Sequence, residues 1–97
     1  MLDADRTGRV DDRATETTIT LYLKLSSGDV SHATFRTFGC SACIAASSIA
    51  TELLIGRGVQ PPTAEEIDQA LGGLPDDKRY CAELVARAAR EALSASK

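Results

Sequence analysis

Aromatic residues and histidine are scarce in this sequence. Its 97 residues include two Phe, two Tyr and no Trp, so the core must be built mainly from aliphatic side chains. His32 is the one histidine, and no Ser–His–Asp or Cys–His arrangement with credible spacing is present. These absences argue against a hydrolytic catalyst, and we expect the protein not to be an enzyme.

The sequence also lacks an excess of basic residues and any long apolar run. Its formal net charge is −3, which argues against nucleic-acid binding because that binding needs a basic face. No apolar run approaches the roughly 20 residues that cross a bilayer. The first residues lack the basic-then-apolar layout of a secretory signal. We therefore expect no membrane partner and a cytoplasmic location, where the three cysteines stay reduced.

Two strands are predicted in the first half of the chain. Residues 1–15 are polar and without period, which predicts a disordered tail before a single domain of residues 16–97. From Thr17 to Leu25 apolar and polar residues alternate, as in a half-buried strand. Residues from Val30 to Phe38 are rich in β-branched and aromatic side chains and are predicted to complete a hairpin.

Three helices are predicted to follow. Apolar residues recur at helical spacing from Ala42 to Ile55, and glycines end this helix. A short helix over residues 63–71 begins with the Thr-x-x-Glu pattern of a capping box. The last helix opens at Pro75 and runs to about Ala95. This order predicts an α+β fold, in which an antiparallel β-hairpin or small sheet packs against three helices.

A sheet of two strands is marginally stable by itself. Either a third strand lies in residues 9–15, or a neighbouring subunit covers the sheet. The second alternative, a homo-oligomer, is the one we favour from the sequence.

The three cysteines lie where predicted helices begin. Cys40 and Cys43 stand where a strand gives way to a helix, and Cys81 stands at the head of the last helix. Unpaired N–H groups and the helix dipole favour a thiolate at such places. The Cys-x-x-Cys spacing suits a zinc half-site, a redox dithiol or part of an iron–sulfur site. Alternatively, Cys43 and Cys81 are small buried side chains on apolar helix faces.

Other candidate ligands are few. His32 precedes Cys40 by eight residues of predicted strand, a separation of roughly 26 Å. We therefore predict a solvated or cross-strand role for this histidine. A four-ligand site in one chain would need the three thiols and a carboxylate, water or sulfide. Lys78 and Arg79 flank Cys81, and they either lower its pKa or are ordinary surface cations.

Two segments resemble the IscU/NifU N-terminal-domain scaffolds. Residues 35–40 (Phe-Arg-Thr-Phe-Gly-Cys), followed by residues 44–53, resemble the second cysteine region of that family. Residues 74–81 resemble its Leu-Pro-Pro-Val-Lys-x-His-Cys segment, and the match covers about residues 17–95. By position, Cys40 corresponds to the second family cysteine and Cys81 to the third.

The sequence departs from this family pattern at several positions. The first family cysteine has no counterpart around residues 15–17, Tyr80 stands where the family has histidine, and Cys43 stands where it has alanine. In one interpretation, Cys43 replaces the lost cysteine in a remodelled site, although it projects from a helix and not from the opposite strand. In a second interpretation, two subunits share their thiols. In a third, the fold persists without metal. In a fourth interpretation, Cys40 or Cys81 accepts persulfide sulfur and no cluster is built.

The resemblance implies a function in iron–sulfur chemistry. Members of the family assemble iron–sulfur clusters on three cysteines and pass them on, usually with a cysteine desulfurase supplying sulfur. By this resemblance we expect a cluster or iron to be bound through Cys40, Cys81 and Cys43, with a cysteine desulfurase and apo-protein recipients as partners. The alternative is a zinc-stabilised or metal-free protein-interaction module, or a persulfide sulfur carrier, of the same fold.

Overall fold

A computed structural model describes residues 5–26, 28–55 and 60–94 of the chain. One antiparallel sheet has the strand order β1-β2-β3, with β1 at Arg6–Asp12, β2 at Thr17–Ser26 and β3 at Asp29–Phe38. Three α-helices follow, α1 at Ser41–Leu54, α2 at Ala64–Ala70 and α3 at Arg79–Ser94, the last preceded by a 3-10 turn at Asp76–Lys78. The predicted α+β fold is confirmed.

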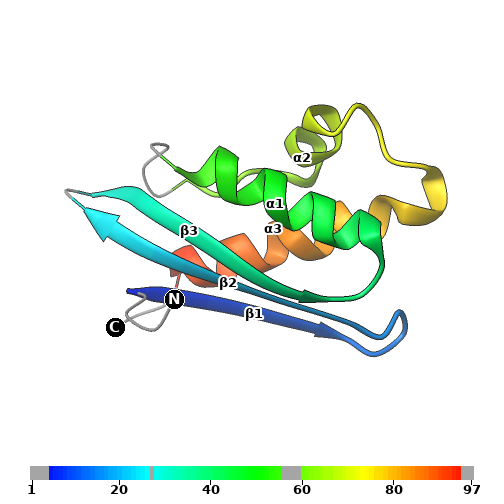
Figure 1. Cartoon of the computed structure of the whole chain (residues 1–97), viewed down its shortest axis with the longest axis horizontal. Coiled ribbons are helices and arrows are strands. Elements are labelled where there is room, and N and C mark those ends of the chain that lie inside the picture. The colour runs from blue at the N-terminus through cyan, green and yellow to red at the C-terminus, as the bar shows by residue number, and fades with distance from the viewer. Residues whose placement is uncertain (1–4, 27, 56–59, 95–97) are drawn as a thin grey trace.

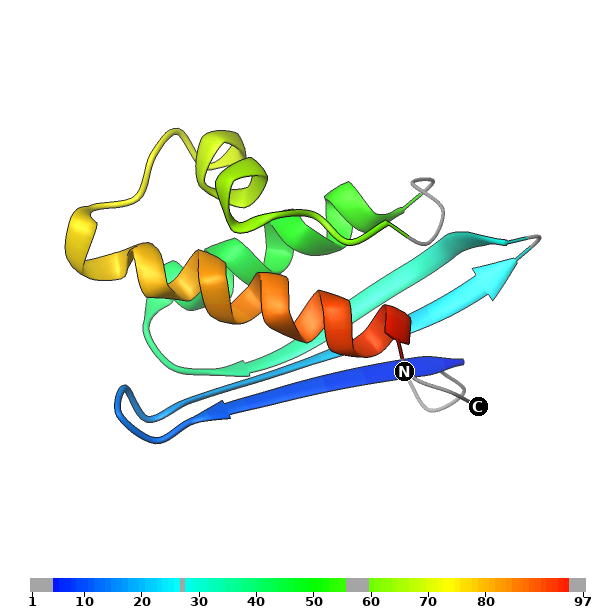
Figure 2. The same cartoon turned by 180° about the vertical axis from the view of Figure 1, so that it is seen from behind.

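The helices lie on one face of the sheet (Figure 1). Helix α1 packs over β3, and α3 packs over β1 and β2 and against α1. Helix α2 lies against α1 and α3 on the side away from the sheet, as the reverse view shows (Figure 2). No element within the described residues covers the other face of the sheet. The end of β3 and the starts of α1 and α3 consequently meet at one end of the molecule.

Strand β2 supplies the centre of the core, as its alternating pattern predicts. Ile19, Leu21 and Leu23 are fully buried, whereas the residues between them are partly exposed. Successive side chains of a strand point to opposite faces, so this alternation sets which face the helices cover. Burying these aliphatic groups supplies the main driving force for packing the helices on the sheet.

The predicted disordered tail over residues 1–15 is wrong for residues 6–12. These residues form β1, which pairs with β2 from Arg6↔Leu23 to Asp12↔Thr17; residues 1–4 lie outside the described part of the chain. The third strand that we considered for residues 9–15 therefore exists and begins at Arg6. With three strands in one sheet, the protein lacks the marginal two-stranded sheet for which a second subunit was expected.

The boundaries of α1 and α2 agree with the sequence pattern, whereas α3 begins at Arg79 and not at the predicted Pro75, because a 3-10 turn over Asp76–Lys78 precedes it. The predicted capping box of α2 is present, because the Glu66 N–H donates to Thr63 Oγ1 at 3.1 Å and the Thr63 N–H donates to Glu66 Oε1 at 3.0 Å. Helix α1 ends at Leu54, one residue before the predicted Ile55, while the glycines expected to end it and the predicted end of α3 at Ala95 lie outside the described residues. The predicted apolar face of α3 is buried, and it consists of Cys81, Leu84, Val85, Ala88 and Ala92.

Gly8 allows β1 to approach α3 closely. A Cβ atom built on Gly8 would overlap the Ala88 carbonyl oxygen and the Ala92 backbone nitrogen. Only a residue without a side chain leaves room for this contact. The small side chains of Ala88 and Ala92, both fully buried, complete the close approach.

We expect Gly8→Ala to destabilise the fold by about 1–3 kcal/mol, because the new methyl group must push β1 away from α3. The free energy of unfolding, measured by urea denaturation, checks this value. Thr7→Ala is the matched control, since Thr7 is exposed on the same strand, and its cost should be within about 1 kcal/mol. Equal stability of the two variants would contradict the close-contact explanation.

Candidate functional site

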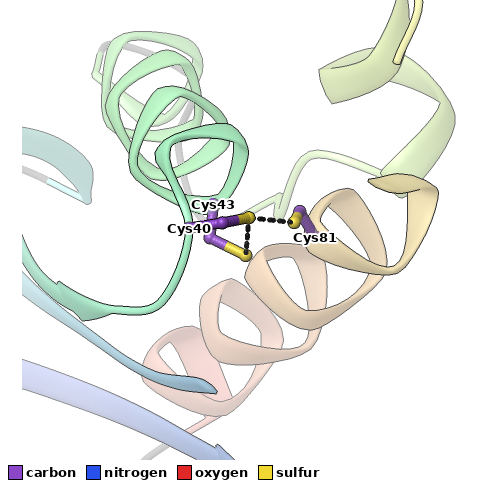
Figure 3. Close-up of side chains that lie close together, drawn as sticks. All are labelled: Cys40, Cys43 and Cys81. Atoms are coloured by element: carbon purple, nitrogen blue, oxygen red, sulfur yellow. Dashed lines mark hydrogen bonds between the residues drawn. The ribbon is translucent and has the colours of Figure 1, made fainter. Parts of the chain in front are cut away.

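Three cysteines meet where β3 ends and α1 and α3 begin. Cys40 is the N-cap residue of α1, Cys43 lies in its first turn, and Cys81 lies in the first turn of α3. The Cys40 Sγ lies 3.8 Å from the Cys43 Sγ and 3.7 Å from the Cys81 Sγ. All three sulfur atoms lie within 4.8 Å of one another, and Figure 3 shows the side chains pointing together. We call Cys40, Cys43 and Cys81 the cysteine triad.

The triad is open to solvent on one side. Cys43 and Cys81 are fully buried, and Cys40 is only half-buried. The prediction that Cys43 and Cys81 occupy apolar helix faces is therefore confirmed, and the same two thiols also belong to the triad. A reagent from solvent can reach the triad through Cys40.

Backbone and side-chain contacts hold Cys40 and Cys43 in place. The N–H groups of Cys43 and Ile44 donate to the Cys40 carbonyl oxygen at 3.0 and 3.2 Å. The Ser47 hydroxyl donates to the Cys43 carbonyl oxygen at 2.8 Å, and its oxygen lies 2.7 Å from Thr37 Oγ1 of β3. These bonds tie the first turn of α1 both to itself and to the sheet, so the two thiols are held in a defined place.

Thr17 and Gly39 lie next to the first turn of α1. Thr17 is 2% exposed at the start of β2. A Cβ atom on Gly39 would lie 3.2 Å from Thr17 Cγ2 and 3.6 Å from Cys43 Cβ. The absence of a side chain at Gly39 therefore lets Thr17 pack beside the triad. The place of Thr17 beside Cys43 could not be predicted from the sequence, because no spacing rule relates residue 17 to residue 43.

The three thiols differ in how readily they ionise. Burial opposes ionisation of Cys40, but the nearby Cys43 backbone N–H, the Tyr80 hydroxyl and the two other thiols outweigh it and lower the Cys40 pKa to about 6. Burial raises the pKa of Cys43 and that of Cys81. The expectation that helix starts favour a thiolate thus holds for Cys40 and is wrong for Cys43 and Cys81, where burial dominates.

Tyr80 is a site residue that sequence analysis did not assign. Its hydroxyl oxygen lies 3.8 Å from the Cys40 Sγ. This hydrogen bond, followed by burial and the two nearby thiols, raises the pKa of Tyr80, so the phenol keeps its proton and can donate it to the Cys40 thiolate. In the sequence, this position stood out only because it holds tyrosine where the IscU/NifU scaffolds have histidine.

The other candidate residues lie outside the triad. His32 is exposed on β3, where its Nδ1 lies 3.2 Å from Ser31 Oγ, as predicted for a solvated side chain. Arg79 is exposed and its Nε lies 3.7 Å from Asp76 Oδ1, in agreement with an ordinary surface cation. Burial and the two other thiols raise the pKa of Cys81, and neither Lys78 nor Arg79 is among the groups that shift it.

The sulfur spacing in the triad fits a single tetrahedral metal ion. Thiolates bound at about 2.3 Å in tetrahedral geometry lie about 3.8 Å from one another. Two of the three separations, 3.7 and 3.8 Å, match this value, and the third lies within 4.8 Å. In the described part of the chain, the triad is the one group of three or more potential ligands close enough to share an ion. Three thiols would leave a fourth position open.

Comparisons with known proteins agree on one family. A family model described as the NifU-like N-terminal domain matches residues 1–97. The chain is 38% identical over 94 residues to the iron-sulfur cluster assembly scaffold protein IscU 1 of Archaeoglobus fulgidus, covering 94% of this chain and 61% of that protein. It is 33% identical to the nitrogen fixation protein NifU of Azospirillum brasilense, covering 95% of this chain and 32% of that protein.

Solved structures share the fold. A putative iron-sulfur cluster assembly scaffold protein for the SUF system from Fervidobacterium islandicum superposes with a TM-score of 0.70 at 18% identity, covering 97% of this chain and 84% of that one. The chain spans 61% of the length of the IscU 1 relative and 32% of the length of the NifU relative.

No helix in the described residues has the length and apolar character needed to cross a membrane.

We expect the alkylation rate of Cys40 to rise with pH through a midpoint near pH 6, because alkylating reagents attack the thiolate and the Cys40 pKa is about 6. Tyr80→Phe removes a donor to that thiolate, so the midpoint should move to higher pH. Peptide mass spectrometry after timed treatment with iodoacetamide measures the rate at Cys40.

The matched control for this experiment is Tyr22→Phe. This substitution also removes a tyrosine hydroxyl, but Tyr22 lies on the sheet face away from the helices. Its midpoint should equal that of the unmodified protein. A midpoint near the ordinary cysteine value of about 8.5 in the unmodified protein would contradict the assignment.

Proposed function

Because the chain belongs to the NifU-like N-terminal domain family, we propose that it is an iron–sulfur cluster assembly scaffold. In this role it receives iron and sulfide, holds them as a labile cluster or its precursors, and releases them to an apo-protein. The cysteine triad is the observation that carries the proposal, since it places three thiols at the spacing of metal ligands beside solvent.

Each thiol of the triad has a distinct part in binding the cargo. Cys40 is half-exposed and ionises most readily, so it is the first thiol to meet incoming iron or sulfur. Cys43 and Cys81 are buried next to it and complete the set of thiol ligands. Iron binding releases their protons, because thiolates are the form that ligates metal. The open fourth position is where sulfide joins and from which the cargo leaves.

Cys43 replaces the missing first family cysteine in this proposal. From the sequence, the position of Cys43 on a helix, and not on the opposite strand, argued partly against that interpretation. Its Sγ nevertheless lies 3.8 Å from the Cys40 Sγ, so a ligand from α1 reaches the same site as one from α3. Three thiols are therefore supplied within one chain, and the site does not require thiols shared between two subunits.

The proposal also names the partners and the compartment. Sulfur would come from a cysteine desulfurase and the cargo would pass to apo-protein recipients. The protein would carry its cargo without acting as an enzyme. The reducing cytoplasm would keep the triad free of disulfides. Cys40, as the half-exposed member of the triad, is the thiol through which both exchanges would occur.

Anaerobic reconstitution with ferrous iron, cysteine and a desulfurase tests the function. We expect visible charge-transfer bands that survive desalting, and bound iron and sulfide that fall to background in Cys40→Ser. His32→Ala is the matched control, because His32 is the only histidine and is exposed away from the triad. Unchanged iron and sulfide in Cys40→Ser, or a flat spectrum in the unmodified protein with its fold intact, would refute the proposal.

A zinc-stabilised interaction module is the second candidate, since the triad spacing fits a single tetrahedral zinc ion equally well. If zinc held the fold together, a chelator would lower the melting temperature sharply, because metal binding energy is then folding energy. We expect instead that a chelator leaves the melting temperature nearly unchanged, and that exposure to air bleaches the reconstituted protein. Melting curves with and without chelator separate the two candidates.

A further inference from the structure

Cys40 and Cys43 form a dithiol on one helical turn. Their backbones are held together because the Cys43 N–H donates to the Cys40 carbonyl oxygen at 3.0 Å. Their sulfur atoms lie 3.8 Å apart, and a disulfide bond is about 2.05 Å long. Rotation of the two side chains can close that gap without moving one helix against another. Cys40 and Cys81 lie at the starts of different helices, so a bond between them would instead link α1 to α3.

The two thiols of this dithiol differ in access. Cys40 is half-exposed at the start of α1, while Cys43 has no exposed surface. A sulfur donor from solvent therefore reaches Cys40 and does not reach Cys43. Cys43 can react only with a sulfur atom that is already in the site, and the Cys40 Sγ is such an atom, 3.8 Å away. This is the arrangement of an accessible acceptor thiol beside a protected resolving thiol.

We propose that Cys43 resolves a persulfide formed on Cys40, releasing sulfide inside the site and leaving a Cys40–Cys43 disulfide. The inference rests on the proposed function for its supply of sulfane sulfur to Cys40. It assigns Cys43 a reaction that is separate from metal ligation. A reducing dithiol from solution then restores both thiols for metal binding.

The step is balanced without an outside reductant. The Cys43 sulfur forms a bond to the Cys40 Sγ, and the bond between the Cys40 Sγ and the outer sulfur breaks. The electron pair of that broken bond leaves with the outer sulfur, which takes the Cys43 thiol proton and departs as hydrogen sulfide. The outer sulfur is reduced to sulfide, and the Cys43 thiol is oxidised into the disulfide. Attack on the outer sulfur instead would only move the persulfide to Cys43.

Cys81 remains a thiol throughout this step. Its Sγ lies 3.7 Å from the Cys40 Sγ, so distance alone does not distinguish it from Cys43. A Cys40–Cys81 disulfide would join the first turns of α1 and α3, and it would have to form across the packed interface between these helices. Reaction within one turn leaves that interface unchanged. With Cys81 still reduced, the released sulfide forms next to a thiol that is ready to ligate metal.

The test uses the full chain and an inorganic polysulfide as the sulfur donor, under anaerobic conditions and without iron. After rapid desalting, thiols are alkylated at timed intervals, released sulfide is measured, and intact and peptide masses are recorded. In the unmodified protein we expect one added sulfur on Cys40 that disappears as sulfide is released. A Cys40–Cys43 disulfide should appear in step with the sulfide.

Two buried thiols are compared by the same substitution. Cys43→Ala should keep its added sulfur on Cys40 and release sulfide at least about tenfold more slowly, because the resolving thiol is gone. Cys81→Ala should still form the Cys40–Cys43 disulfide. Circular dichroism shows whether each variant is folded, and the peptide map of the unmodified protein identifies the disulfide without relying on either variant.

Three results would overturn the inference. They are sulfide release from Cys43→Ala at the unmodified rate, a Cys40–Cys81 disulfide in place of Cys40–Cys43, and an unmodified protein that gains no sulfur or keeps it. Because the experiment contains no iron, its outcome is independent of the reconstitution that tests the scaffold function. Failure of cluster assembly with intact sulfide release, or the reverse, would show which of the two proposals is wrong.

Discussion

The packing of α1 against α3 above the sheet is the interaction on which the site depends. Both helices bury mainly small side chains, among them Ala46 and Ala50 of α1 and Ala88 and Ala89 of α3. Small side chains let helices and strands approach closely while the interior stays densely packed. Because α1 and α3 begin at the same end of the molecule, their packing brings Cys40 and Cys81 together across 41 residues of chain.

Unequal burial gives three identical side chains different chemistry. Cys40 is half-exposed and surrounded by hydrogen-bond donors, which lower its pKa, while desolvation raises the pKa of Cys43 and of Cys81. An accessible thiolate beside two protected thiols suits both the capture of cargo and its retention. The same asymmetry underlies the proposed division between Cys40, which accepts sulfur, and Cys43, which resolves it.

Local signals in the sequence predicted most of the elements correctly. The alternation in β2 and the capping box of α2 depend on residues close together in the chain, so their patterns can be read directly. Strand β1 was only one of two alternatives in the sequence analysis, because Gly8 and Val10 are its only buried residues and the residues around them are polar. Its stability comes from pairing with β2 and from contact with α3, and neither leaves a periodic pattern in residues 6–12.

The sequence by itself determined which residue types could carry the chemistry, since its cysteines and their places at predicted helix starts follow from composition and local pattern. Only the tertiary structure decided that Cys43, Cys81 and the Tyr80 hydroxyl lie within reach of the Cys40 sulfur. It also decided which thiol ionises. Distance and burial depend on how elements remote in sequence pack together, and a local pattern of residues contains no information about either.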